Sequence, residues 1–393
     1  MATNHTPLLF VLFGYVALVP LSIHAKCYGL KIDATIQHAD PESGTIPLGS
    51  NSFWWTDDFC PVVISPGDSI RIDIYLDGEE CHGGFWGSIT RNGNLTDTLS
   101  FPFSIYIPLW ITEPGEYRIR GGEHSWPEDA IYSPGDPELR FTVVEEGTTS
   151  INMRIRGLYL QGVAESGANS PMRTTLWDSG LIPQVEPYTT MGFQSVESSG
   201  ATIPSAALRP SIYPVEDWVR LELYADQSLS TFTAATNALL LSNGVIRSAE
   251  YFGTSVLFNA PSGTYFLRVV HRNHLPTTFG PIQLEQPAAC VNLASTPVFG
   301  EDTRVIVGNT YCLRAGNAHL DPGPQRISYT GANNDRDPIL QRIGGEITTA
   351  TVSGYFNEDV NMDGVVKYTG ANNDRDVVLQ AIGGSVVTVV VTE

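Results

Sequence analysis

The sequence predicts a mainly β fold, with two β-sandwich-like domains followed by a small pair of loop–helix units. The first observation is that apolar and polar residues alternate in segments rich in β-branched and aromatic side chains, which is typical of half-buried strands. The second is that turn-forming dipeptides separate these segments, as at Pro66-Gly67, Pro114-Gly115 and Ser262-Gly263. Short strands with turn chemistry between them favour sandwiches over helical folds.

The first 25 residues are expected to be a signal peptide. Residues 7–23 are almost wholly apolar but form a short run for a membrane span, and residues 22–25 supply a cleavage site. No Lys or Arg precedes the apolar run, and an N-terminal membrane anchor is the alternative. No later stretch is long and apolar enough to span a bilayer. The mature chain is therefore predicted to be secreted, either released or held at the cell surface, without a membrane span.

A first β-sandwich is expected over residues 26–147. It contains the alternating segment 69–75 and ends with segments 117–120 and 139–144. A turn into a Tyr-bearing strand late in a domain is typical of immunoglobulin-like sandwiches. We therefore predict an immunoglobulin-like architecture for this domain.

A second β-sandwich-like domain is expected over residues 151–287, after the short polar linker 145–150. Its strongest strand patterns are the alternating segments 218–224 and 265–270. The tail, residues 288–393, differs because it contains an internal repeat.

Charge and cysteine content limit the function classes. The formal net charge is −20, with only 22 Lys and Arg residues, and this excludes nucleic-acid binding, which needs clustered basic residues. The five cysteines form no CxxC pair, and in an exported chain disulfides are expected. Sequence separation groups Cys290 with Cys312. The three remaining cysteines are Cys27, Cys60 and Cys81. Two of them would pair with each other, and the third would stay free.

A nine-residue segment occurs twice in the tail. Residues 329–337 read YTGANNDRD, and residues 368–376 repeat them. Each copy continues into a short apolar, helix-like run, 338–343 and 377–382, followed by Gly-Gly, which commonly ends a helix in the left-handed region. Two copies are too few for a solenoid, so they predict a pair of similar units packed on each other.

An acidic loop before the second copy predicts a Ca²⁺ site. Calcium takes several oxygen ligands, and a loop supplies them with Asp or Asn at alternate positions and a Gly that turns the chain. Asp359, Asn361 and Asp363 stand at loop positions one, three and five. Gly364 follows at six, and Val365 would add its backbone carbonyl at seven.

Either Asp374 or Asp376 is expected to close this loop. Asp376 is slightly favoured because a helix follows it directly, and an acid there complements the helix N-terminus. The alternative is a turn cluster without a metal, which is common in β-proteins. The second acidic cluster, the following helix and export to a calcium-rich compartment favour the Ca²⁺ interpretation.

The upstream copy predicts at most a weak second metal site. Asn317, His319 and Asp321 could take the equivalent loop positions, but a proline interrupts the loop and His is a poor ligand for hard Ca²⁺. Asp335 and Asp337 are retained from the repeated segment. We expect weak binding or a purely structural role in which the two units pair.

These tail residues resemble the duplicated calcium loop of dockerin domains. The match is closer to a dockerin-like variant with the Tyr-Thr-Gly-x-x-Asn-Asp-Arg-Asp segment, found at the C-termini of secreted proteins of Bacteroidetes-type bacteria. It covers roughly residues 310–384, and segments such as 172–176 and 270–275 resemble an extracellular β-module that accompanies such tails. The resemblance implies Ca²⁺ binding and a cohesin-like protein partner, because dockerins attach polysaccharide-degrading enzymes to a cohesin scaffold.

No catalytic constellation is identified, so an enzyme is not expected. His271 and His274 form a candidate metal pair, but they follow a strand and lack an HExxH helix, so polar packing is favoured. The Gly-x-Ser-x-Gly elbow of hydrolases does not occur. Paired glycosidase carboxylates stay open, because 42 acidic residues make spacing uninformative.

Trp54 and Trp55 are candidates for glycan stacking, because they form an aromatic run beside two carboxylates. Core or edge packing is the favoured alternative, since Trp is a highly buried residue on average. The same choice applies to Trp86 and Trp110.

The leading function hypothesis is a secreted, calcium-binding, multidomain binding or docking protein, with a carbohydrate or cell-surface ligand. One alternative is a catalytic or non-catalytic subunit of a polysaccharide-degrading complex, attached through a dockerin-type tail. The other is a structural surface or matrix component. A glycan bound without cleavage would favour the first, released oligosaccharide the second, and self-association without any ligand the third.

Overall fold

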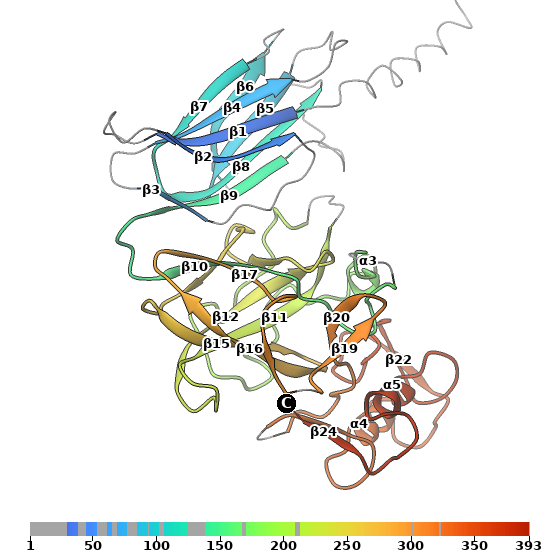
Figure 1. Ribbon diagram of the computed structural model, residues 1–393. Coiled ribbons are helices and arrows are strands. Elements are labelled where there is room, and N and C mark those ends of the chain that lie inside the picture. Colours follow the sequence, from blue (N-terminus) through green and yellow to red (C-terminus); the bar gives the residue numbers. More distant parts are fainter. Residues whose placement is uncertain are drawn as a thin grey trace, which may run out of the picture. The chain divides into compact units, whose positions relative to one another are not determined.

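Strands dominate the computed structural model, and helices are few and short (Figure 1). The mainly β fold predicted from alternation is therefore confirmed. The predicted signal peptide, Trp54, Trp55 and three of the cysteines lie outside the described residues. Those described are 30–37, 45–52, 61–64, 69–76, 85–92, 94–101, 106–123, 138–166, 170–208, 213–300, 302–321 and 324–392.

The chain divides into two compact units, residues 1–59 with 64–143 and residues 60–63 with 144–393. The N-terminal unit contains two sheets, and buried side chains such as Ile70 and Ile119 come from both. One sheet has the order β2-β1-β4-β7, from β1 (Leu30–Gln37), β2 (Thr45–Ser52), β4 (Ser69–Leu76) and β7 (Tyr106–Ile111). The other has the order β3-β9-β8-β5-β6, from β3 (Val62–Ile64), β5 (Phe85–Arg91), β6 (Asn94–Phe101), β8 (Gly115–Glu123) and β9 (Glu138–Glu145).

The second unit is built on a nine-stranded sheet. Its path is β14-β10-β13-β12-β11-β15-β16-β18, and the ninth strand, β17, pairs in parallel with β10. The strands are β10 (Ile151–Arg156), β11 (Val215–Tyr224), β12 (Phe232–Leu241), β13 (Ile246–Ser248), β14 (Val256–Phe258), β15 (Gly263–His271), β16 (His274–Leu284), β17 (Ala288–Asn292) and β18 (Val298–Phe299). Since β17 and β18 belong to this sheet, the boundary predicted at residue 287 falls between its strands.

Both faces of this sheet are covered by packed segments, as the side chains of β11 show. Val219 and Leu221 pack into one core cluster, whereas Trp218 packs into a different one. Successive side chains of a strand point to opposite faces, so a strand buried on both sides is apolar at successive positions. The large sheet therefore provides a rigid support for the segments that pack on either side of it.

The predicted pairing of Cys290 with Cys312 is wrong. Cys290 is disulfide-bonded, whereas Cys312 keeps a free thiol. The two lie on strands of different sheets, since β17 pairs with β10, and β20 (Thr310–Leu313) pairs with β19 (Arg304–Val307). Burial raises the pKa of the Cys312 thiol to about 12, which leaves it inert.

The two repeat copies each form a short helix as predicted, α4 (Arg336–Arg342) and α5 (Asp374–Ala381). The Gly pairs that follow, at 344–345 and 383–384, have positive φ, so they end the helices in the expected way. Two antiparallel pairs complete this part: β21 (Arg326–Ser328) with β24 (Val390–Thr392), and β22 (Thr351–Ser353) with β23 (Val365–Lys367).

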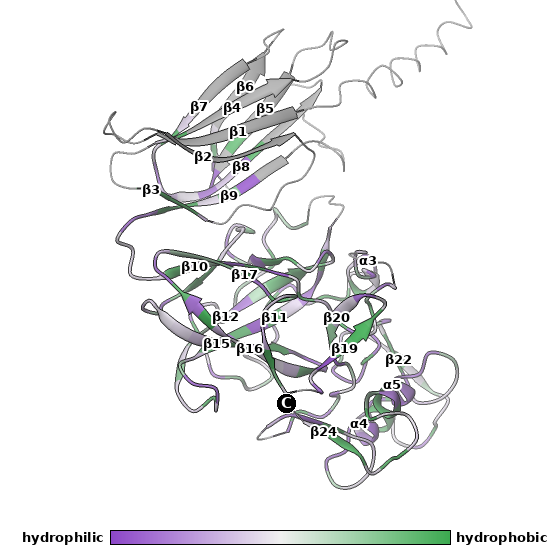
Figure 2. Ribbon diagram, in the orientation of Figure 1, coloured by the Kyte–Doolittle hydropathy of each residue, from purple (hydrophilic) through white to green (hydrophobic). Residues whose placement is uncertain are grey.

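One hydrophobic core joins both copies. Ile339 of α4 and Val378 of α5 are fully buried in it, together with Leu275 of β16. Figure 2 shows the short strand β24 as hydrophobic, and Val391 on that strand is buried in the same core. Within the part of the chain that the structure describes, none of the helices reaches the length and hydrophobicity that crossing a membrane requires.

Candidate metal centre

The acidic loop between β22 and β23 is held by its own polar side chains. An oxygen of Asp359 accepts the Gly364 N–H at 3.0 Å. Asn361 accepts the Asp363 N–H at 2.8 Å, and Asp363 accepts the Val365 N–H at 3.0 Å. The side chains at loop positions one, three and five therefore curl the backbone around themselves, which is how short polar side chains stabilise tight loops.

Asp374 lies against this loop, whereas Asp376 has other partners. Asp374 is fully buried and accepts the N–H groups of Asn361 at 3.3 Å and of Lys367 at 2.8 Å. The Asp376 side chain is about half exposed and pairs with Arg375 at 3.0 Å. The acid that contacts the loop is thus Asp374, and not Asp376, which the sequence slightly favoured.

The loop concentrates negative charge. Burial raises the pKa of Asp359 to about 6, and the charge of Asp363 adds to the shift. Burial raises the pKa of Asp374 to about 8, with further contributions from both other carboxylates. Lys367 lies 2.7 Å from Asp363, and the charge of Arg272 acts against the shift at Asp359. Buried carboxylates that repel each other are stabilised in ionised form by a bound cation.

The residues fit a hard cation in chemistry, although over the described ranges no three His, Cys, Asp or Glu side chains stand in the arrangement of a formed metal site. A carboxylate oxygen has two lone pairs, so an oxygen that accepts a backbone N–H can still ligate an ion. The atoms that could ligate a metal at the loop are all oxygens, which suits Ca²⁺ and not softer metals. For Ca²⁺ to reach Asp363, the Lys367 ammonium has to move away.

Several residues of the repeated segment form contacts that stabilise the N-terminus of the helix. In the second copy, Asn373 accepts the Asp376 N–H at 2.9 Å, and the Arg375 guanidinium lies 5.2 Å from the centre of the Tyr368 ring. Hydrogen bonds from Asn373 and Arg375 outweigh burial and lower the pKa of Asp376. The first copy has the same contacts through Asn334, Asp337, Arg336 and Tyr329. Capping therefore explains why Asp337 and Asp376 recur.

Asp335 plays the part of Asp374 in the first copy. It is fully buried and accepts the N–H groups of His319 at 2.9 Å and of Ser328 at 2.7 Å. Burial raises its pKa to about 7, and the charge of Asp321 contributes. The acid that closes each loop is thus common to both copies.

The interior of the first loop is filled differently. The Gln325 amide accepts the Asp321 N–H at 3.3 Å and donates to the Asp321 carbonyl at 2.8 Å. Asn317 also lies 3.3 Å from the Gln325 amide. Arg326 lies 3.5 Å from the Asp321 carboxylate. Gln325 thus bonds the main chain of Asp321, whereas the Asp321 carboxylate has Arg326 only as an ion-pair neighbour. The sequence pattern did not suggest a role for either Gln325 or Arg326.

The turn between β15 and β16 contacts the start of both loops. Asn273 is fully buried, and its carbonyl accepts the N–H groups of Gly316 at 3.2 Å and Asn317 at 3.1 Å. Its side chain donates to the carbonyl of Asp359 at 2.5 Å. Arg272 also donates to a main-chain carbonyl of the second copy, that of Phe356. These contacts join residues far apart in sequence, and no local pattern predicted them.

His271 and His274 belong to a buried polar network that supports this turn. His271 lies 3.1 Å from Asp217 and 2.9 Å from His274, which in turn lies 2.9 Å from the Gln161 carbonyl. Arg272 donates to Asp217 at 3.0 Å, and burial lowers the pKa of both histidines. Since these side chains are at most 1% exposed, the arrangement agrees with polar packing, not with an accessible metal pair.

No protein-family model matches the chain, and a comparison with curated proteins also finds no match. The dockerin resemblance and the cohesin-like partner it implies are therefore hypotheses that depend on the loop residues alone.

Proposed function

We propose that the protein is a secreted, calcium-binding protein of the binding or docking class, whose second C-terminal loop binds one Ca²⁺. The observation that carries this proposal is the contact of Asp374 with the loop of Asp359, Asn361 and Asp363. Asp374 accepts N–H groups of Asn361 and Lys367, and both Asp359 and Asp374 are buried. Burial raises the pKa of these two carboxyls, and the charge of Asp363 adds to both shifts.

The ligands would be the side chains of Asp359, Asn361, Asp363 and Asp374, with the main-chain carbonyl of Val365. Ca²⁺ would neutralise the carboxylates in place of Lys367, which pairs with Asp363. Because the folded loop binds the ion and the unfolded chain does not, binding stabilises the folded tail by mass action.

The position of the loop gives this stabilisation a role. The main-chain carbonyls of Asp359 and Phe356 accept hydrogen bonds from the turn between β15 and β16. Ca²⁺ bound at Asp359 would therefore stiffen the connection between the repeat and the large sheet. A rigid, protease-resistant tail suits a docking element or a spacer.

Secretion is supported by the disulfide at Cys290, because disulfides persist mainly in oxidising compartments. The acidic composition and the predicted signal peptide agree with an extracellular, calcium-rich setting. The two alternatives, a subunit of a polysaccharide-degrading complex and a surface or matrix component, share the calcium loop. Only their ligands distinguish them.

The test is a calorimetric Ca²⁺ titration of the full chain after removal of metal with a chelator. The full chain is needed because β17 and β18 tie the tail to the sheet. We expect one clear Ca²⁺ site that is lost in Asp363→Ala and kept in Asp376→Ala. Asp376 is the matched control because its carboxylate pairs with Arg375. No binding heat and no Ca²⁺-dependent protection from protease would show that the loop is only turn chemistry.

A further inference from the structure

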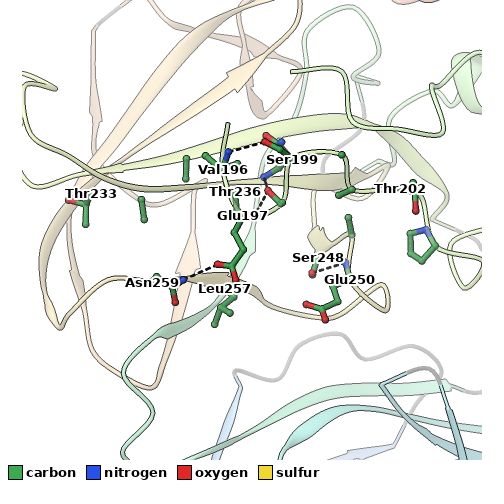
Figure 3. Close-up of a pocket in the computed structure, with 18 of the residues that line it drawn as sticks. Val196, Glu197, Ser199, Thr202, Thr233, Thr236, Ser248, Glu250, Leu257 and Asn259 are labelled. Carbon is green, nitrogen blue, oxygen red and sulfur yellow. Dashed lines mark hydrogen bonds between the residues drawn. The ribbon is translucent and has the colours of Figure 1, made fainter. Parts of the chain in front are cut away.

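A pocket of about 580 Å³ lies on the large sheet, away from the calcium loop. It is formed by residues 196–204, the first half of β12, the turn after β13, and residues 257–259 around the end of β14. Figure 3 shows Glu197, Thr236 and Asn259 among its lining side chains. Its size is that of pockets that bind small molecules.

The wall formed by residues 196–204 is held in place by hydrogen bonds. Ser198 accepts the main-chain N–H of Asn237 at 2.6 Å. Ser199 accepts the Val196 N–H at 2.8 Å (Figure 3). Glu197 accepts from the Asn259 amide at 2.8 Å across the pocket. The wall is therefore tied both to β12 and to the segment after β14, so the pocket is formed before any ligand enters.

Asn237 carries an unpartnered amide at the pocket. Its side chain lines the pocket and is only 2% exposed, yet neither its oxygen nor its nitrogen has a hydrogen-bond partner. The next residue along β12, Ala238, packs into the core on the opposite face of the strand. A buried amide without partners is costly, and such groups in folded proteins are usually satisfied by water or a ligand.

The lining favours a partner that both donates and accepts hydrogen bonds. Hydroxyl and amide groups predominate, and each can do both. The hydroxyls come from Ser198, Ser199, Thr202, Thr233, Thr236 and Ser248. Among the described residues of the lining, none is Lys, Arg or His, which disfavours an anion. A cation would use the carboxylates of Glu197 and Glu250 but would leave the donors unused.

The pocket also offers apolar contacts. Phe232 is 39% exposed and Leu257 is 43% exposed, and both line it. The ring of Phe232 packs edge-on against Tyr224, with 5.7 Å between ring centroids, so its position is defined. A pyranose ring combines hydroxyl groups with apolar C–H faces, and it can therefore use both kinds of contact.

We infer that this pocket binds a neutral saccharide, with Asn237 as the central hydrogen-bonding residue. The inference rests on the extracellular binding function proposed above, but the site shares no residue with the calcium loop. It places carbohydrate recognition on β12, at a site separate from the predicted Trp54–Trp55 segment.

The test uses the full chain on an array of neutral hexasaccharides of glucose, xylose, mannose and galactose, with oligogalacturonate as the acidic probe and spermidine as the cationic one. The strongest neutral hit is then titrated by calorimetry. We expect Asn237→Leu, which removes the amide at similar volume, to weaken binding about tenfold or more. Gln283→Leu, an exposed amide of β16 outside the pocket, is the control and should bind as the parent does.

Melting temperature separates a ligand-binding role of Asn237 from a structural one. If the amide is satisfied by a ligand, Asn237→Leu should melt no lower than the parent without saccharide, since it removes an unpaired buried group. A lower melting temperature with unchanged saccharide affinity would overturn the inference. So would binding of spermidine or oligogalacturonate alone, or of no probe at all.

A Ca²⁺ titration of the same preparations keeps the two proposals apart. Loss of saccharide binding in Asn237→Leu with an unchanged Ca²⁺ site supports the pocket. Ca²⁺ binding without any saccharide binding overturns the pocket alone, and saccharide binding without Ca²⁺ overturns the calcium loop alone.

Discussion

The two copies of the C-terminal repeat have the same helix start but different loop interiors. Asp335 and Asp374 close their loops with equivalent hydrogen bonds, and the same capping residues precede both helices. In the first loop, Gln325 and Arg326 surround Asp321. In the second, Gly364 stands in the place of Gln325, so no side chain fills that position. The first loop fills this position with an amide, whereas the second leaves it open and holds three carboxylates, of which Asp363 pairs with Lys367.

Removal of the first loop ligand should have the largest effect. Asp359→Ala takes away a buried carboxylate, and we expect Ca²⁺ affinity to fall about a hundredfold, because the oxygen ligands set the affinity of such loops. Asn317→Ala, the equivalent change in the first copy, should leave the affinity unchanged. Calorimetric titration of both variants checks this. An equal loss in both would mean that the ion binds between the copies and not in the second loop.

Asp217 supports the turn between β15 and β16, which contacts both loops, so loss of its charge should affect both loops alike. Attraction to Arg272 and a hydrogen bond with His271 outweigh burial and lower the pKa of Asp217 to about 2. This is below its unfolded value, so the carboxylate contributes stability that is fully present above about pH 4 and is lost as the pH falls through 2. We expect a loss of about 2 kcal/mol over that range.

Urea unfolding between pH 2 and pH 5 measures this dependence. Asp217→Asn should be less stable at neutral pH and should show a flatter acid limb than the parent chain. Hydrogen exchange at neutral pH should be faster in this variant at residues 316–328 and at residues 355–367. A loss confined to one loop would contradict the common support.

Substitution of Asn273 should affect the second loop and not the first. Its main chain contacts the first copy, whereas its side chain contacts the second copy, at Asp359, and His274 of the polar network. Asn273→Ala should therefore cost about 1–2 kcal/mol, because it leaves the buried Asp359 carbonyl without that donor. Faster hydrogen exchange is expected at residues 355–364 and not at residues 316–328. Equal changes in both segments would disprove this division of contacts.

The smallest expected effect concerns the lysine that competes with the ion. Lys367 pairs with Asp363 and is only partly buried, so its removal frees one carboxylate for Ca²⁺. We expect Lys367→Met to raise Ca²⁺ affinity about threefold, the size of a partly exposed ion pair. Arg326→Met in the first copy should leave the affinity unchanged. A weaker affinity in Lys367→Met would show that the lysine maintains the loop instead of competing with the ion.

The parts of the fold that depend on neighbouring residues were predictable. The alternating segment at 218–224 is β11, and the apolar runs after the repeated segments are α4 and α5. The choice between Asp374 and Asp376 was not predictable, because both lie in the first turn of α5 and differ in which side of the helix they face. Cys290 was assigned by sequence separation, which says nothing about the strand on which its partner lies.

By itself the sequence determined the mainly β fold, the repeated loop–helix unit and the acidic positions of the second loop, because alternation, capping and ligand spacing are local properties of the chain. Tertiary structure decided that Asp374 faces the loop, that Gln325 fills its counterpart, and that Asn273 joins both. It also placed the unpaired amide of Asn237 in a pocket. Each of these depends on segments brought together by the large sheet, and burial there makes an unpaired charge or amide costly enough to need a partner.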